Sequence, residues 1–144
     1  MNKTRIAEWS DLSPLTPTYA LVANVDLVIV RWEEGENVSV LYGRCQHRGA
    51  LLADGTIRGE DLICGVHDWD YRYKTGVSGY NDAEKLHKFQ AWVVAGGVHV
   101  DADEIARSVI IICPRQTASA PAPWGRVRGA VPRCDAQLPI ARAR

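Results

Sequence analysis

Apolar positions along this 144-residue chain come in short runs separated by polar or glycine-containing breaks, without a long helical period. The runs are rich in valine, isoleucine and tyrosine and occur at residues 19–24, 27–32, 38–42, 62–64, 70–73 and 91–94. Runs of this length and composition predict β-strands. Gly96-Gly97 predicts a two-residue hairpin turn that leads into a further strand at 98–100.

The spacing of these strands predicts an all-β fold, a small antiparallel β-sandwich or barrel. The breaks between strands fall at residues 24–26, 33–36 and 53–55, and residues 56–64 supply strands between two loops that are described below. Brief helical segments are expected at 82–86 and 103–108. The length leaves room for one domain, which we place at 19–105 after an N-terminal segment at 1–18.

Residues 106–144 differ in composition from the rest of the chain. They hold seven basic side chains, all arginine, and one acidic side chain, whereas residues 1–105 hold ten basic and sixteen acidic ones. Five of the seven prolines also lie there. We therefore interpret 106–144 as a basic, proline-rich tail and predict that 114–144 are disordered. The tail has only one aromatic residue, Trp124, among its arginines, so nucleic-acid binding is not expected.

The longest apolar stretches, 27–30 and 109–113, are far shorter than the roughly 20 residues of a membrane-spanning helix. The first residues also lack the apolar core of a secretory signal, because Lys3, Arg5, Glu8 and Asp11 interrupt them. These features predict a cytoplasmic protein without a membrane partner.

Two short motifs combine cysteine with histidine, Cys45-Gln46-His47-Arg48-Gly49 and Cys64-Gly65-Val66-His67. Each supplies one thiolate and one imidazole from a tight loop, and such spacing in a chain without a secretory signal indicates a metal site rather than a disulfide. One cysteine and one histidine in each loop suit a site with two irons, in which both thiolates bind one iron and both imidazoles bind the other. A structural zinc site accepts the same side chains and stays open as an alternative.

The pair of motifs, followed by Tyr71-Arg72-Tyr73-Lys74-Thr75-Gly76, resembles the Rieske family over roughly residues 20–100. The resemblance implies a two-loop cluster-binding subdomain that holds one [2Fe–2S] cluster and passes single electrons. It assigns Cys45 and Cys64 to one iron, and His47 and His67 to the other.

Three departures from the family pattern bear on the reduction potential. Ala50 and Val66 stand where respiratory Rieske proteins have a pair of disulfide-forming cysteines, and Trp69 stands where those proteins have a serine that donates a hydrogen bond to the cluster. Tyr71 matches the family's sulfur-bonding tyrosine. Asp68 replaces the usual glycine, and its carboxylate is expected to favour the oxidised cluster. These departures are typical of a lower-potential, ferredoxin-like or oxygenase-associated member.

Residues 67–81 and 85–89 resemble more narrowly the Rieske domains that precede FMN-binding glutamate-synthase-like domains. The resemblances imply an electron carrier with no substrate-transforming site of its own, and a redox partner that is a flavin-dependent reductase, an oxygenase or an FMN-binding glutamate-synthase-like domain. The chain is alternatively the electron-input domain of a truncated enzyme of that last kind.

A terminal oxygenase is disfavoured, because only His87 and His99 are left to bind a mononuclear iron, and packing or surface roles suit them better. Cys113 and Cys134 have no partnering histidine and are expected to be thiols.

Overall fold

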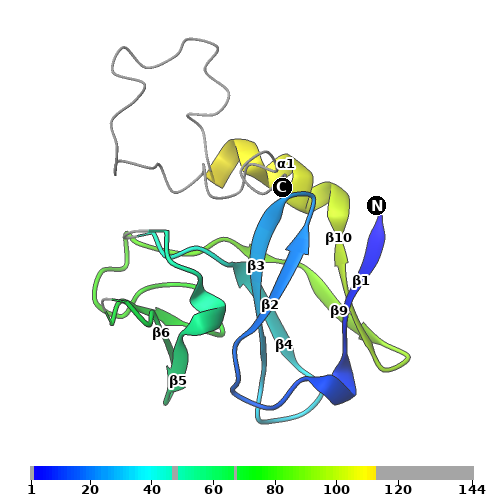
Figure 1. Ribbon diagram of the computed structural model, residues 1–144, viewed down its shortest axis with the longest axis horizontal. Coiled ribbons are helices and arrows are strands. Elements are labelled where there is room, and N and C mark those ends of the chain that lie inside the picture. Colours follow the sequence, from blue (N-terminus) through cyan, green and yellow to red (C-terminus); the bar gives the residue numbers. More distant parts are fainter. Residues whose placement is uncertain (1, 47–48, 67, 113–144) are drawn as a thin grey trace, which may run out of the picture.

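The computed structural model describes residues 2–46, 49–66 and 68–112, and the strands of these residues form three antiparallel sheets (Figure 1). The first sheet has the order β1-β10-β9, with β1 at Lys3–Glu8, β10 at Gly97–Asp101 and β9 at Ala91–Val94. The second has the order β2-β3-β4-β8, with β2 at Thr18–Val22, β3 at Val25–Arg31, β4 at Val38–Tyr42 and β8 at Lys88–Phe89. The third has the order β5-β6-β7, with β5 at Thr56–Arg58, β6 at Asp61–Ile63 and β7 at Asp70–Arg72. The predicted all-β class is confirmed.

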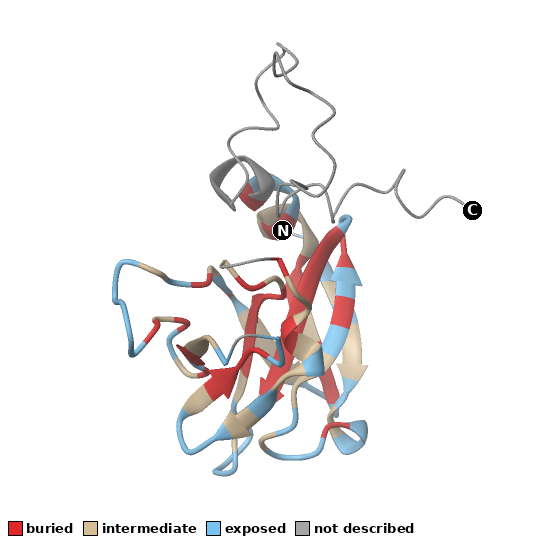
Figure 2. Ribbon diagram, turned by 60° about the vertical axis from the view of Figure 1, so that its left-hand side comes forward, coloured by how far each residue is buried: buried red, intermediate tan, exposed pale blue. Residues whose placement is uncertain are grey.

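The first two sheets close around the apolar core. β1 contacts β2, and β4 contacts β9, so the sheets meet along both of these sides. Every residue of β3 from Val25 to Val30 is buried, and Figure 2 shows this strand as a continuous buried stretch. The helix α1 (Ala102–Ile112) contacts β2 and β3. A strand covered on both faces explains why residues 27–30 read as an unbroken apolar run instead of an alternating one.

The third sheet forms a small subdomain beside the second sheet, on the left of Figure 1. A short 3-10 helix, η2 (Leu52–Asp54), precedes it and contacts β3. One cysteine motif precedes η2 in the sequence, and the other connects β6 to β7 within this sheet. The predicted two-loop subdomain therefore has its own sheet.

Two hairpin turns differ by one or two residues from the sequence prediction. Gly97 pairs with Val94, so the turn between β9 and β10 is Ala95-Gly96 and not Gly96-Gly97. Ala95 and Gly96 have φ of 50° and 74°, the left-handed values of the hairpin turn that matches strand twist. The β2–β3 turn is likewise Ala23-Asn24, so β3 begins two residues earlier than expected.

Several elements were missed or misjudged from the sequence. β1 and β8 were not expected, and a second 3-10 helix, η1 (Trp9–Asp11), follows β1. The helical turn expected at 82–86 is wrong: the Glu84 N–H donates to the Asn81 carbonyl at 2.9 Å and closes a β-turn. The helix expected at 103–108 is longer at both ends. Because β1 pairs with β10, the segment before residue 18 shares a sheet with the rest, and the domain boundaries at 18 and 105 stay a prediction.

The predicted disordered tail, 114–144, and Cys113 and Cys134 lie outside the described residues. Within the part of the chain that the structure describes, no helix has the length and apolar character that crossing a bilayer requires.

Candidate metal centre

Loop one, residues 45–50, is closed by two backbone hydrogen bonds across its neck. The Cys45 N–H donates to the Ala50 carbonyl at 2.9 Å, and the Gly49 N–H donates to the Cys45 carbonyl at 2.7 Å. Gly49 has φ of 75°, a left-handed conformation that glycine adopts without steric cost. The loop thereby returns to its starting point within six residues.

Loop two, residues 64–69, is closed in the same way. The Cys64 N–H donates to the Trp69 carbonyl at 2.8 Å, and the Asp68 N–H donates to the Cys64 carbonyl at 3.1 Å. Asp68, at the position equivalent to Gly49, has φ of 55°. A side chain there costs about 1–2 kcal/mol, although aspartate tolerates the conformation better than most residues. Glycine would adopt this conformation without that cost, so Asp68 carries a backbone penalty.

The strands anchor both loops. Loop one follows β4 through Gly43, whose N–H donates to the Asp26 carbonyl at 2.7 Å. A Cβ on Gly43 would lie 2.7 Å from the backbone of Leu27, so only glycine allows this approach to β3. Loop two joins β6 directly to β7. Each loop thus starts from a strand whose position is set by sheet pairing.

The two cysteines are the predicted ligands that the structure describes. Cys45 and Cys64 are each 1% exposed and belong to the same apolar core cluster. Both are thiols that no disulfide joins to each other. His47 and His67 lie outside the described residues. Within 2–46, 49–66 and 68–112, no three His, Cys, Asp or Glu side chains gather as a metal site, and this range excludes both predicted imidazoles.

Tyr71 on β7 reaches the base of loop one with its hydroxyl. The ring is fully buried, and the hydroxyl oxygen accepts a hydrogen bond from the Gln46 N–H at 2.9 Å. The same oxygen lies 3.6 Å from the Cys45 Sγ. Burial raises the pKa of Tyr71, and its hydrogen bond with Cys45 raises it further. The hydroxyl therefore keeps its proton at neutral pH. It donates a hydrogen bond to the Cys45 sulfur whenever that residue is a thiolate.

This donor set fits an iron–sulfur cluster. Metal-binding cysteines act as thiolates, which require hydrogen-bond donors when they are buried away from water. Loop one provides such a donor at Cys45 through Tyr71, an assignment that the sequence resemblance had made and that the geometry supports.

The outer part of loop two reaches solvent although its cysteine is buried. Val66 is 61% exposed, and Tyr80 is 83% exposed with its ring centroid 6.0 Å from that of Trp69. Val66 and Tyr80 are among the few large apolar side chains of the described residues that are exposed. The two cysteines are thus buried, whereas Val66 and Tyr80 leave apolar side chains exposed.

A third segment, residues 78–81, is held against the start of β7. The Asp70 carboxylate accepts hydrogen bonds from the Gly79 N–H at 2.7 Å and from the Ser78 hydroxyl at 3.4 Å. No local sequence signal distinguishes Asp70 from other surface acids. Its two hydrogen bonds depend on a segment eight and nine residues away that the fold brings close.

The two histidines that lie within the described residues have local contacts. The His87 ring packs against Phe89 with centroids 4.6 Å apart, and the His99 Nδ1 lies 3.1 Å from the Gly97 carbonyl oxygen. These contacts agree with the packing roles expected for them.

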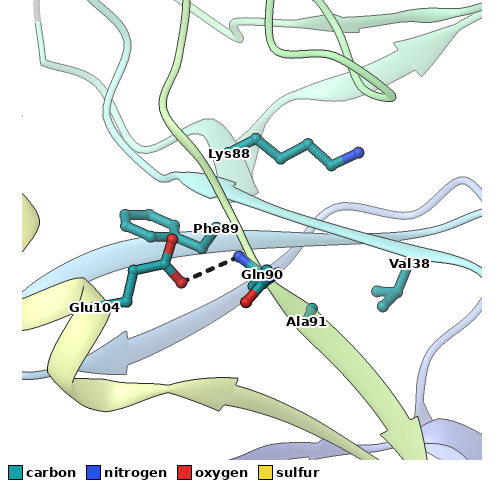
Figure 3. A pocket seen from close by; sticks show the side chains of 6 residues that line it. All are labelled: Val38, Lys88, Phe89, Gln90, Ala91 and Glu104. Carbon is teal, nitrogen blue, oxygen red and sulfur yellow. Dashed lines mark hydrogen bonds between the residues drawn. The ribbon is translucent and has the colours of Figure 1, made fainter. Parts of the chain in front are cut away.

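A pocket of about 370 Å³ opens between β4, β8, β9 and α1 (Figure 3). Its lining residues are Val38, Lys88, Phe89, Gln90, Ala91 and Glu104. The Glu104 carboxylate accepts a hydrogen bond from the Gln90 N–H at 3.2 Å and so caps the end of β8. None of these residues belongs to loop one or loop two, so the pocket is separate from the candidate metal centre.

Comparisons with known proteins agree with this geometry. The family described as Rieske [2Fe-2S] domain matches residues 2–90. The oxidoreductase NdmD of Pseudomonas putida is 32% identical over 82 residues, which are 53% of this chain and 14% of that protein. A probable 3-ketosteroid-9-alpha-monooxygenase oxygenase component of Rhodococcus rhodochrous is 39% identical over 46 residues, 32% of this chain and 11% of that protein.

The chain thus spans only a small fraction of these two relatives. Among solved structures, the ferredoxin of carbazole 1,9a-dioxygenase from Nocardioides aromaticivorans IC177 superposes with a TM-score of 0.63 and 22% identity. The superposition covers 69% of this chain and 97% of that ferredoxin.

Proposed function

Because this chain belongs to the Rieske [2Fe-2S] domain family, we propose that it is a one-electron carrier whose cluster is held by Cys45, His47, Cys64 and His67. The family's [2Fe–2S] cluster is the cofactor of the chain. The observation that carries the ligand assignment is the matched closure of loops one and two, each of which begins with a buried cysteine and contains one histidine in its sequence.

When bound, the cluster accepts and releases one electron at a time. Two thiolates and two neutral imidazoles balance the charge of two ferric ions and two sulfides, whereas four thiolates leave two negative charges. This ligand set therefore favours reduction, and Rieske potentials lie at about −150 to +300 mV, against roughly −400 mV for plant-type ferredoxins. The burial of Cys45 and Cys64 excludes water from the sulfur side, and the Tyr71 hydroxyl stabilises negative charge at Cys45.

For the partner, we propose a flavin-dependent reductase as electron donor and an oxygenase as acceptor. The similar proteins support the choice of acceptor: one is a ferredoxin of a dioxygenase, and another is an oxygenase component. A fused or separate FMN-binding glutamate-synthase-like domain remains the second candidate partner. The coding sequence next to this one distinguishes them, since an oxygenase subunit supports the first proposal and a flavin domain the second.

Metal and sulfide analysis of the full-length chain tests the cluster assignment. We expect two iron and two acid-labile sulfide per chain, with an electron paramagnetic resonance signal after reduction. Cys45→Ser, His47→Gln, Cys64→Ser and His67→Gln are each expected to lose the signal. His99→Gln is the control that retains it. A colourless protein with one zinc per chain would contradict the proposal and favour the structural zinc site.

A further inference from the structure

A chain of three side chains connects the core sheet to loop one. The Tyr19 hydroxyl donates to the Asp26 Oδ1 at 2.7 Å, and the Arg44 Nε donates to the Asp26 Oδ2 at 2.8 Å. The Arg44 Nη1 then donates to the Gly49 carbonyl at 2.9 Å. The connection runs from β2 and β3 to the residue that closes loop one.

The ion pair within this connection is largely buried. The side chains of Asp26 and Arg44 are 3% and 17% exposed, in contrast to 64% and 50% for the Glu60–Arg72 pair. A buried ion pair gains little net stability, because both charges lose their hydration. The role of the Asp26–Arg44 pair is therefore better judged from its geometry than from its contribution to the free energy of folding.

That geometry holds the Gly49 residue from two sides. The Gly49 N–H donates to the Cys45 carbonyl at 2.7 Å, and its carbonyl accepts from Arg44. The planar guanidinium presents its donors in a fixed fork, so it bonds Asp26 and Gly49 at the same time. Lysine carries the same charge but not this fork. Arg44 is thus placed to define the shape of loop one.

The pair also brings charge next to a proposed ligand. Arg44 directly precedes Cys45, and a cation near a redox centre favours the reduced form, which carries one more negative charge. Asp26 offsets that cation. Removal of one member leaves an unbalanced charge at a site poorly screened by water.

We propose that the Asp26–Arg44 pair is a positioning and charge-balancing unit for loop one. Arg44 holds the Gly49 carbonyl, while Asp26 orients Arg44 and offsets its charge, so that the pair helps to set the midpoint potential. The inference rests on the proposed function, because it takes Cys45 as a cluster ligand.

The charge-balancing part is tested by Asp26→Asn in the full chain, with Glu60→Gln as the matched control in an exposed pair. Protein-film voltammetry of Asp26→Asn is expected to show a higher midpoint potential. The expected shift is at least a threefold change in the ratio of reduced to oxidised protein at a fixed potential, about 28 mV for a one-electron couple. Glu60→Gln is expected to stay at the wild-type value. Equal potentials in the two variants would overturn this part.

The positioning part is tested by Arg44→Lys, with Arg72→Lys as the matched control. Hydrogen–deuterium exchange of the Cys45 and Gly49 amides is expected to accelerate at least tenfold in Arg44→Lys and to remain unchanged in the control. Unchanged amide exchange in Arg44→Lys would overturn the positioning role. This test does not depend on Asp26→Asn, so it holds even when that variant fails to fold.

The two proposals fail in different ways. A wild-type chain without iron and sulfide refutes the proposed function, while the exchange comparison still reports on Arg44. A wild-type chain with an intact cluster, together with unaltered potentials and exchange rates in the variants, refutes only the Asp26–Arg44 inference.

Discussion

Replacement of Tyr71 by phenylalanine removes a single hydroxyl from a fully buried ring on β7 that reaches loop one. Two interactions are lost with it: the acceptor for the Gln46 N–H at 2.9 Å, and the contact with the Cys45 Sγ at 3.6 Å. The ring itself remains, so no cavity larger than one oxygen atom forms. The variant therefore isolates hydrogen bonding from packing.

The structure allows a rough estimate of both effects. Loss of the acceptor for a partly buried N–H costs about 1–2 kcal/mol of unfolding free energy. Hydrogen bonds to charged groups contribute about 1 kcal/mol more than those between neutral groups. We take this as the difference between the reduced and oxidised cluster, which corresponds to about 40 mV for a one-electron couple. Because the reduced cluster carries more negative charge on sulfur, the midpoint potential of Tyr71→Phe is expected to fall by about this amount.

Protein-film voltammetry and thermal melts of the full-length chain measure the two quantities. Tyr73→Phe is the matched control, since Tyr73 is also buried but packs edge-on against Trp32 with ring centroids 6.3 Å apart. We expect its potential to stay at the wild-type value. An unchanged or higher potential in Tyr71→Phe, with an intact paramagnetic signal, would refute the reasoning, and so would an equal fall in Tyr73→Phe.

Three further predictions follow from the described residues. Asp68→Gly is expected to raise the midpoint potential, because it removes a carboxylate, and to stabilise the fold by about 1 kcal/mol, because glycine adopts the left-handed backbone conformation without steric cost. Asp68→Asn is expected to raise the potential alone. Voltammetry and melts that fail to separate the two variants would contradict this. The N–H of Asn2 donates to Asp101 and lowers the pKa of that carboxyl below its ordinary value. The stability lost in Asp101→Asn is therefore expected in full above pH about 5 and to shrink progressively as pH falls from about 4 through the lowered pKa. A difference in melting temperature that stays constant from pH about 5 down to about 2 would be the opposing result. Leu27→Ala in the fully buried β3 is expected to cost about 2–5 kcal/mol in urea denaturation, and Leu21→Ala, at a 45%-exposed position, less than about 0.5 kcal/mol; similar costs would argue against the burial assigned here.

The strands with strong apolar runs were predictable, because short runs rich in valine, isoleucine and tyrosine favour an extended backbone. β4 and β9 begin and end where the sequence indicated. β1 was missed because its six residues include only Ile6 as a large apolar side chain, and its extended form depends on pairing with β10. β8 has two residues and depends in the same way on β4. A polar or very short strand has too little hydrophobic signal of its own.

For the candidate site, the chain's own motifs determined the chemistry, since cysteine and histidine at these spacings have few uses other than metal binding. They also located Tyr71 through resemblance. The hydrogen-bond partners of the loops were not predictable in this way. Asp26 and Arg44 are 18 residues apart, and Cys45 and Tyr71 are 26 residues apart, so only chain folding brings them together.

The amino-acid sequence by itself therefore determined the class of fold, the cofactor chemistry and the order of the loops, because these depend on side-chain type and local spacing. Tertiary structure decided which charges and hydroxyls face the cysteines, because such contacts form between segments distant in sequence. It also decided the left-handed backbone at Asp68, where the closure of loop two imposes a conformation that the residue alone does not favour.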